Sequence, residues 1–263
     1  MSLAILTDLT RCVGCRGCVL ACKEINELPA GSTERLSSLT WTALERRAGL
    51  NVRRQCMHCV EPACASVCPV GALKKLPSGP VVYNERLCMG CRYCMAACPF
   101  RVPKYEWDKQ LPRVRKCVMC YDKRLKNGKP PACTTACPTQ ATVFGNRDDL
   151  IREARSRIRA GNGRYVDRVF GLEEAGGTSV LYLSSVPFDK LGFPTAVDRE
   201  PYPLLTWKVL SKIPDFVGVW SVVLLGVWWI VSRRMELERH GEGEHPGADR
   251  RGSGRWQRSG SSG

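Results

Sequence analysis

The stretch that decides the fold is CMGCRYCMAACP, residues 88–99, which spaces four cysteines as C-x2-C-x2-C-x3-C and ends in a proline. Related cysteine groups occur three more times, so the chain contains an internal repeat of one small unit. We call the copies motifs I to IV, and together they hold all 16 cysteines of the 263-residue chain. They are motif I (Cys12, Cys15, Cys18, Cys22), motif II (Cys56, Cys59, Cys64, Cys68), motif III (Cys88, Cys91, Cys94, Cys98) and motif IV (Cys117, Cys120, Cys133, Cys137).

The spacing of these cysteines indicates iron–sulfur clusters. Three thiolates of a compact C-x2-C-x2-C run can bind one face of a [4Fe–4S] cube, and the fourth cysteine faces away and serves a second cube. Zinc sites usually join two C-x2-C pairs across a longer gap, often with histidine, and this chain has only three histidines. Disulfides would leave strained or unpaired thiols in such short runs. We therefore predict four [4Fe–4S] clusters, with zinc and disulfides as weaker alternatives.

Crossed ligation also constrains which motifs pair. Motifs II and III are separated about as far as the halves of a small two-cluster ferredoxin, so they are predicted to form an inner unit, about residues 52–105. Motifs I and IV then form an outer unit around it. The predicted ligand sets are Cys12, Cys15, Cys18 and Cys137 for cluster 1; Cys22, Cys117, Cys120 and Cys133 for cluster 2; Cys56, Cys59, Cys64 and Cys98 for cluster 3; and Cys68, Cys88, Cys91 and Cys94 for cluster 4. Pairing of motif I with II and of III with IV is the alternative.

The predicted fold class is α+β, with two pseudo-symmetric ferredoxin-like βαββαβ units, one inserted in the other, over residues 1–145. Strands are predicted at residues 2–9, 79–85 and 140–146, which flank the cysteine turns. Residues 36–47 are expected to add a strand or hairpin at the surface.

Residues 146–212 are predicted to contain a helix, a strand and a Pro-rich linker. The helix has Asn146 as its N-cap, acidic residues in its first turn and Gly161 at its end. The strand is expected within GGTSVLYLSSVP, residues 176–187.

A single transmembrane helix is predicted at residues 213–232. The segment from Phe216 to Ser232 has no charged residue and, as a helix, would span about 26 Å of hydrocarbon. Trp228 and Trp229 lie near its end, as interfacial anchors do. A buried helix in a soluble core is the alternative. Residues 233–263 are rich in Gly, Ser and charge, and they are predicted to be disordered.

The sequence favours neither a nucleic-acid-binding protein nor a catalyst. Its formal net charge is +15, but the basic residues are scattered and lack regularly interleaved aromatic residues. Four clusters of roughly −2 each would also offset part of that charge. We find no Gly-rich nucleotide loop and no Ser/His/Asp cluster. His58 is interpreted as an ordinary loop residue, with hydrogen bonding to a cluster as the alternative.

With these motifs in view, a family resemblance can be named. Residues 3–145 resemble the four-cluster ferredoxin-type electron-transfer subunits of molybdopterin oxidoreductase and [NiFe]-hydrogenase complexes. The blocks CMHCVEPACASVCPVGAL and KCVMC…PACTTACPTQAT carry the match. The later GGTSVLYLSSVPFDKLGFP, followed by one apolar helix, is similar to the β subunit of membrane-bound formate dehydrogenase and to the iron–sulfur subunit of quinone-reducing membrane hydrogenase. The resemblance covers roughly residues 3–232.

The resemblance implies a role in electron transfer and not in catalysis. The subunit would relay electrons between a large catalytic subunit, which carries a molybdenum- or tungsten-pterin or a [NiFe] centre, and an integral membrane cytochrome b or quinone-binding subunit. A stand-alone polyferredoxin or redox sensor is the rival function, and a zinc-dependent nucleic-acid-binding protein is a weaker one.

The implied location is the inner (cytoplasmic) membrane, crossed once. Arg233 and Arg234 after the helix favour a cytoplasmic C-terminus and a periplasmic cluster domain. Lys208 and Lys212 before the helix reduce the difference in positive charge between its two ends. A cluster domain on the cytoplasmic face is therefore the alternative. Residues 1–12 show no export signal. Export to the periplasm would therefore require a signal-bearing partner, as the family uses.

Overall fold

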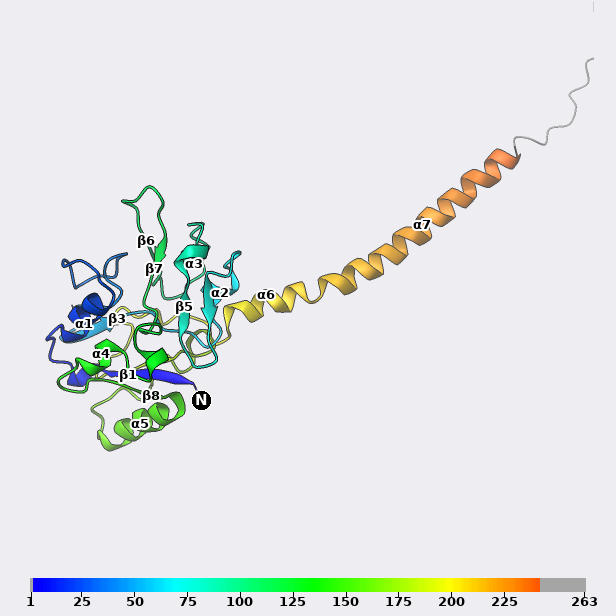
Figure 1. The fold of residues 1–263 in the computed structure, drawn as a ribbon. Helices are drawn as coiled ribbons and strands as arrows, with labels where there is room; N and C mark the ends of the chain where they lie inside the picture. Colours follow the sequence, from blue (N-terminus) through cyan, green and yellow to red (C-terminus); the bar gives the residue numbers. More distant parts are fainter. Residues whose placement is uncertain (1, 242–263) are drawn as a thin grey trace, which may run out of the picture. The chain divides into compact units, whose positions relative to one another are not determined.

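The computed structural model describes residues 2–241 (Figure 1). The chain divides into two compact units, one ending at Lys208 and the other beginning at Val209, and each is described by itself. The first unit mixes short helices with short strands, as a ferredoxin-type domain does.

A three-stranded sheet forms the base of the first unit. Strand β1 (Leu3–Asp8) lies in its middle, antiparallel to β8 (Thr142–Asn146) and parallel to β9 (Val180–Leu183). Successive side chains of a strand point to opposite faces, so β1 contributes to two cores. Ala4 and Leu6 pack in one core with helix α5, whereas Ile5 packs in the other. Both faces of β1 are therefore buried.

Helix α5 (Arg147–Ala160) covers one face of this sheet (Figure 1). The side chain of Asn146 accepts a hydrogen bond from the backbone N–H of Asp148 at 3.0 Å and caps the helix. Gly161 is the C-cap residue. The predicted start and end of this helix are confirmed, as are the predicted strands at β1, β8 and β9.

An aromatic core covers the opposite face of the sheet. Phe170 lies at its centre, with its ring centroid 4.6 Å from that of Phe193 and 5.2 Å from that of Phe188. Tyr182 on β9 packs in the same core, together with Val52, Met57, Met119 and Cys133 from the cysteine-rich part. These four aromatic residues lie within residues 146–212, the segment predicted to connect the cluster domain to the membrane helix. They form much of this core.

Three antiparallel hairpins complete the first unit. Their strands are β2 (Ala43–Arg47) with β3 (Leu50–Arg54), β4 (Leu73–Lys75) with β5 (Val81–Tyr83), and β6 (Lys104–Tyr105) with β7 (Val114–Arg115). The β2–β3 hairpin confirms that a hairpin follows motif I, but it extends further along the chain than residues 36–47, and Ala43 and Val52 are buried, so its predicted surface position is wrong. Strand β5 confirms the strand predicted at residues 79–85.

Each motif also contains one short helix. These are α1 (Gly17–Ile25), α2 (Ala63–Ser66), α3 (Tyr93–Ala96) and α4 (Ala132–Thr135). Helix α1 packs against α4, and α2 packs against α3. Motif I therefore contacts motif IV through helices, and motif II contacts motif III. Three single-turn 3₁₀ segments, Leu9–Arg11, Glu85–Leu87 and Leu125–Asn127, lie between these elements, and a fourth, Glu174–Gly176, precedes β9.

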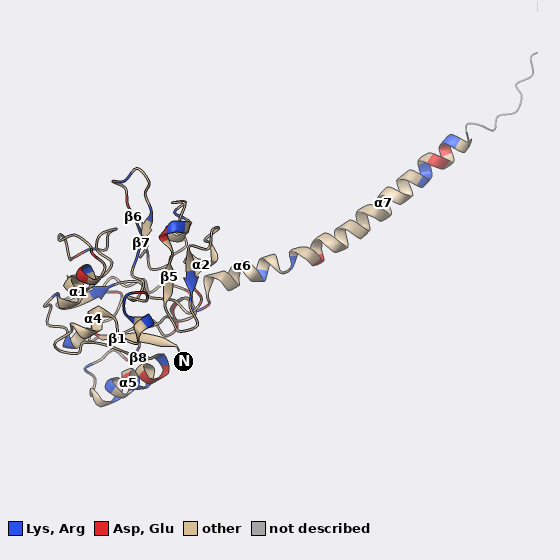
Figure 2. Cartoon of the chain, in the orientation of Figure 1, with Lys and Arg blue, Asp and Glu red and all other residues tan. Residues whose placement is uncertain are grey.

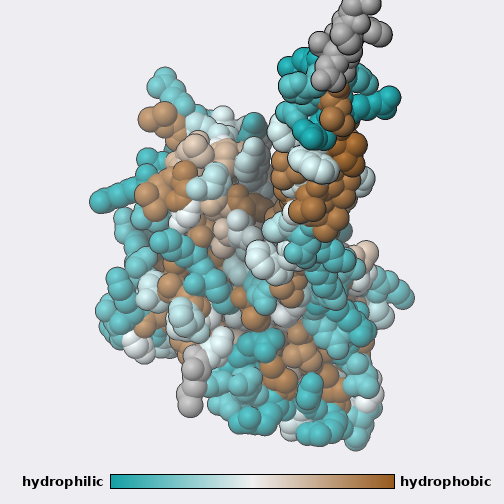
Figure 3. Space-filling view, turned by 90° about the vertical axis from the view of Figure 1, so that its right-hand side faces the viewer, coloured by the Kyte–Doolittle hydropathy of each residue, from teal (hydrophilic) through white to brown (hydrophobic). Residues whose placement is uncertain are grey.

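The C-terminal region is helical. Helix α6 (Tyr202–Leu210) occupies part of the expected linker, and α7 spans Ile213–Gly241. The stretch Tyr202–His240 is long and apolar enough to cross a membrane, with a mean hydropathy of 1.8 in its most apolar window. Apolar side chains dominate the middle of the helix face seen in Figure 3, and Figure 2 shows that the charges lie towards its two ends and not in the middle.

Helix α7 continues beyond the predicted end at Ser232. Residues 233–241, predicted to be disordered, are helical instead. Arg233 pairs with Glu236 and Arg234 with Glu238, both at 3.2 Å, and such i,i+3 and i,i+4 ion pairs stabilise a helix. The rest of the predicted tail, residues 242–263, lies outside the described residues.

Candidate metal centres

The four motifs share one backbone turn. The residue directly before the second cysteine of each motif has a positive φ, and these residues are Gly14 (78°), His58 (48°), Gly90 (74°) and Met119 (57°). In this turn the backbone N–H of Met119 donates to the Sγ atom of Cys117 at 3.3 Å. Gly14 and Gly90 make the equivalent contacts to Cys12 and Cys88. Glycine adopts this conformation without the roughly 1–2 kcal/mol that other residues lose.

Two cavities are each lined by four cysteines from two motifs. One is lined by Cys12, Cys15 and Cys18 of motif I and Cys137 of motif IV. The other is lined by Cys88, Cys91 and Cys94 of motif III and Cys68 of motif II. In both cavities three thiols come from one motif and the fourth from another, as in crossed ligation.

The remaining eight thiols lie in two buried groups. Burial raises the pKa of Cys22 to about 12, and the nearby thiols of Cys133 and Cys120 contribute to that rise. Burial likewise raises the pKa of Cys59 well above its ordinary value, and Cys56, Cys98 and Cys64 add to it. Such thiols ionise only when a positive partner compensates for the charge of the thiolate, and iron supplies that charge when it binds.

The donor sets fit a polynuclear iron–sulfur group. All 16 cysteines lie in the described residues and are free thiols. Within residues 2–241 no group of three or more His, Cys, Asp or Glu side chains is spaced to hold a single metal ion. The thiols instead surround enclosed spaces, and soft thiolate ligands in sets of four are the ligands that [4Fe–4S] clusters take.

The four thiol groups follow one another in series. Cys18 of the first group and Cys133 of the second lie close enough to raise the pKa of Cys18, after the larger effect of burial. Cys56 of the third group raises the pKa of Cys117 in the same way, and Cys94 of the fourth group raises the pKa of Cys64. Cys15 and Cys91, in the first and last groups, are exposed to solvent. The series therefore begins and ends at the surface and passes through the interior.

His58 lies in a loop, as predicted, and its side chain is buried. Its Nδ1 atom accepts a hydrogen bond of 2.9 Å from the backbone N–H of Val81, so its proton lies on Nε2. Nε2 has no hydrogen-bond partner. Burial, followed by the charges of Lys116 and Lys75, lowers the pKa of His58 well below its ordinary value and keeps the ring neutral. This burial could not be predicted, because residues in turns are usually exposed.

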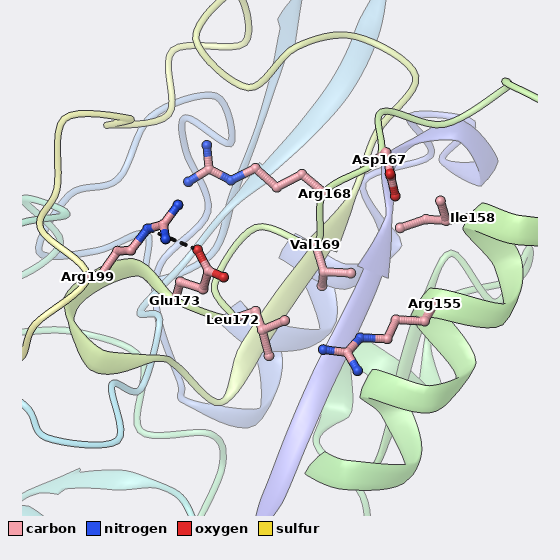
Figure 4. A pocket seen from close by; sticks show the side chains of 8 residues that line it. All are labelled: Arg155, Ile158, Asp167, Arg168, Val169, Leu172, Glu173 and Arg199. Atoms are coloured by element: carbon pink, nitrogen blue, oxygen red, sulfur yellow. Dashed lines mark ion pairs between the residues drawn. The ribbon is translucent and has the colours of Figure 1, made fainter.

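A surface pocket lies beside α5. It is lined by Arg155, Ile158, Asp167, Arg168, Val169, Leu172, Glu173 and Arg199 (Figure 4). Arg199 pairs with Glu173 at 3.2 Å, and Arg168 pairs with the buried Glu174 at 2.6 Å. The lining contains no cysteine, serine or histidine that could act as a nucleophile or base.

Comparison with known proteins identifies the family. Residues 49–147 match the 4Fe-4S dicluster domain. The chain is 42% identical to a protein of Nitratidesulfovibrio vulgaris, over 92% of this chain and 70% of that relative. It is 37% identical to the hydrogenase-2 operon protein HybA of Escherichia coli O157:H7, over 92% and 88% of the two chains. It is 32% identical to the formate dehydrogenase iron–sulfur subunit of Haemophilus influenzae, over 93% and 85%.

These matches confirm that the clusters are of the 4Fe–4S type and that the subunit transfers electrons. The chain belongs to the family of iron–sulfur electron-transfer subunits of respiratory oxidoreductases, and it is a non-catalytic member of such a complex.

Proposed function

We propose that this subunit relays electrons through four [4Fe–4S] clusters between a large catalytic subunit and an integral membrane subunit. The catalytic partner would carry a molybdenum- or tungsten-pterin or a [NiFe] centre, and the membrane partner would be a cytochrome b or a quinone-binding protein. The serial arrangement of the four thiol groups carries this proposal, because single electrons can pass between neighbouring clusters. When bound, the clusters supply the one-electron chemistry, and the protein supplies their ligands and their insulation.

The proposed ligand sets are those of crossed pairing. Cluster 1 would take Cys12, Cys15, Cys18 and Cys137, and cluster 4 would take Cys68, Cys88, Cys91 and Cys94; the two cysteine-lined cavities support these sets. Clusters 2 and 3 would take the two buried groups, which are Cys22, Cys117, Cys120 and Cys133 for cluster 2 and Cys56, Cys59, Cys64 and Cys98 for cluster 3. The packing of α1 on α4 and of α2 on α3 favours this pairing over that of motif I with II.

The same pairing supports two nested ferredoxin-like units within residues 1–145. The inner unit, about residues 52–105, would contain motifs II and III, and the outer unit would contain motifs I and IV. The turn common to all four motifs and the pairing of β1 with β8 support this arrangement. Residues 146–212 would complete the outer unit and lead to the membrane helix at 213–232.

Each end of the relay would face one partner. Exposed Cys15 places cluster 1 near the surface, and exposed Cys91 does the same for cluster 4. The ligands of cluster 2 are all buried, which keeps its electron inside the protein. The two partner subunits would therefore dock beside motifs I and III.

Metal analysis and one cysteine variant test the relay. The complex, isolated anaerobically, is expected to contain about sixteen iron and sixteen sulfide ions per chain of this subunit and to give paramagnetic signals after reduction with dithionite. Colourless, zinc-loaded protein would contradict the proposal. Cys94→Ser should stop electron transfer to quinone while the catalytic subunit still reduces artificial dyes. Equal loss of both activities would argue against a relay, and isolation without a catalytic partner would favour a stand-alone polyferredoxin or redox sensor.

We further propose that α7 crosses the inner membrane once, with the clusters on the periplasmic side and the C-terminus in the cytoplasm. The exposed apolar surface of α7, Trp228 and Trp229, and the arginines that follow support this assignment. Deletion of residues 213–263 should release this subunit from membranes that lack the integral partner. Protease added to right-side-out spheroplasts should cleave the cluster domain, and protection of that domain would favour the cytoplasmic alternative.

A further inference from the structure

Arg53 is a buried cation beside the predicted ligands of cluster 1. It lies on β3, and only 1% of its surface is exposed. It lines the same cavity as Cys12, Cys15, Cys18 and Cys137. Its charge also acts on Cys133 and Cys117, two of the predicted ligands of cluster 2. Arg53 therefore lies between the two thiol groups of motifs I and IV.

The guanidinium of Arg53 has unused hydrogen-bond donors. Nη2 donates to the side-chain oxygen of Gln55, but Nε and Nη1 have no hydrogen-bond partner among the residues that the structure describes. Within residues 2–241 Arg53 forms no ion pair with a carboxylate. An isolated buried charge with unsatisfied donors costs several kcal/mol, so such a group is retained where a negative partner compensates for it.

The adjacent arginine provides a contrast within the same strand. The Nε atom of Arg54 pairs with Glu45 at 2.5 Å, and its Nη2 atom donates to the carbonyl of Leu191. Its guanidinium also lies 4.1 Å from the centre of the Phe193 ring. The charge of Arg54 is thus compensated by a carboxylate, whereas the neighbours of Arg53 include cysteine thiols, Tyr182 and the neutral Gln55.

We infer that Arg53 is the counter-charge of clusters 1 and 2 and raises their reduction potentials. A [4Fe–4S]2+ cluster with four thiolates carries about −2, and it reaches about −3 when it accepts one electron. A fixed positive charge nearby stabilises the reduced form more than the oxidised form, and the free N–H groups of Arg53 can donate to cluster or cysteine sulfur. This inference rests on the proposed ligand sets for clusters 1 and 2.

Redox titration of the intact complex, monitored by electron paramagnetic resonance, tests the inference. Arg53→Met removes the charge at similar side-chain volume, and Gln55→Glu leaves the guanidinium in place but pairs it with a carboxylate. Both variants should lower two of the four midpoint potentials, while the iron content stays at the wild-type value. Arg53→Lys keeps the positive charge, so its midpoint potentials should stay close to the wild-type values. Arg54→Met is the matched control, because Glu45 already compensates for that charge, and its four potentials should stay unchanged.

These experiments distinguish a failure of the role inferred for Arg53 from a failure of the proposed four-cluster relay. Unchanged potentials in Arg53→Met and Gln55→Glu, with full iron content, would overturn the role of Arg53 and leave the four-cluster relay intact. Loss of iron from both variants would also overturn it, because Arg53 would then be needed for assembly and not for tuning. A wild-type complex with fewer than four reducible clusters would instead contradict the proposed function.

Discussion

In the proposed nested arrangement, the outer unit, with motifs I and IV, rests on a three-stranded sheet, helix α5 and a core of four aromatic rings. The inner unit, with motifs II and III, consists mainly of the β4–β5 hairpin, strand β6 and two single-turn helices, and β7 of the segment that follows pairs with β6. One buried cluster of this region contains five residues, Cys64, Leu73, Val81, Cys94 and Val114, the last of which lies on β7. Two of the five are cysteines that would bind clusters 3 and 4.

The same cysteine turn therefore occurs in two kinds of scaffold, one with a large apolar core and one with a small core. Small cores rarely provide more than a few kcal/mol, and natural small domains often add a metal to reach stability. The inner unit fits that description, so its clusters would act as its structural core. The outer unit also has the core beneath α5, whose buried residues are all apolar and include no proposed cluster ligand.

Removal of iron should reveal this difference most strongly. When the purified complex is treated with a chelator under reducing conditions, backbone amides of β4 to β7 should lose their protection from hydrogen exchange, because the clusters no longer join motifs II and III. Amides of β1, β8 and β9 should keep much of theirs. Mass spectrometry of exchanged peptides measures both regions in one sample. Equal loss of protection in the two regions would contradict the comparison.

A substitution in the aromatic core should affect the outer unit instead. Phe170→Ala should cost about 3–5 kcal/mol, because Phe170 is fully buried and contacts Tyr182, Phe188 and Phe193. Thermal unfolding and hydrogen exchange should show β1 and β9 opening first. Trp107→Ala is the control, since Trp107 is mostly exposed and lies on the inner hairpin loop. A larger effect of Trp107→Ala would show that the aromatic core is not the main support of the outer unit.

The smallest expected effect concerns the cap of α5. Asn146→Ala removes the hydrogen bond to the N–H of Asp148 and should cost about 1 kcal/mol in the outer unit. Asn146→Asp should retain most of the stability, because its carboxylate can accept the same bond. Denaturant titration of the cluster-loaded protein measures both changes. No difference between the two variants would exclude capping as the role of Asn146.

Local patterns predicted much of this fold. The cysteine spacing, the alternation in β1 and the capping residues of α5 each act within a few residues, so they can be read from the sequence. The partner of β9 could not be predicted, because pairing with β1 depends on chain segments more than 170 residues apart. For the same reason the sequence did not place Phe170, Phe188 and Phe193 in one core.

The candidate site was predictable in its ligands but not in its surroundings. The spacing of the cysteines predicts that they are ligands. Arg53 and Arg54 are the same residue type at adjacent positions, so only their burial and their partners in the structure distinguish them. His58 lies in a turn, where exposure is the usual outcome. The helix beyond Ser232 was missed because its ion pairs appear in the sequence only as a high density of charge.

The order of strands in the main sheet has a consequence for biosynthesis. Strand β1 leaves the ribosome first, yet its neighbours β8 and β9 are encoded near residues 142 and 180. At translation rates of about 5–20 residues per second, β1 waits roughly 10–35 s for its last neighbour. During that interval the apolar LAIL segment is unpaired, and in the proposed ligand sets the assembly of cluster 1 has to await Cys137 of motif IV.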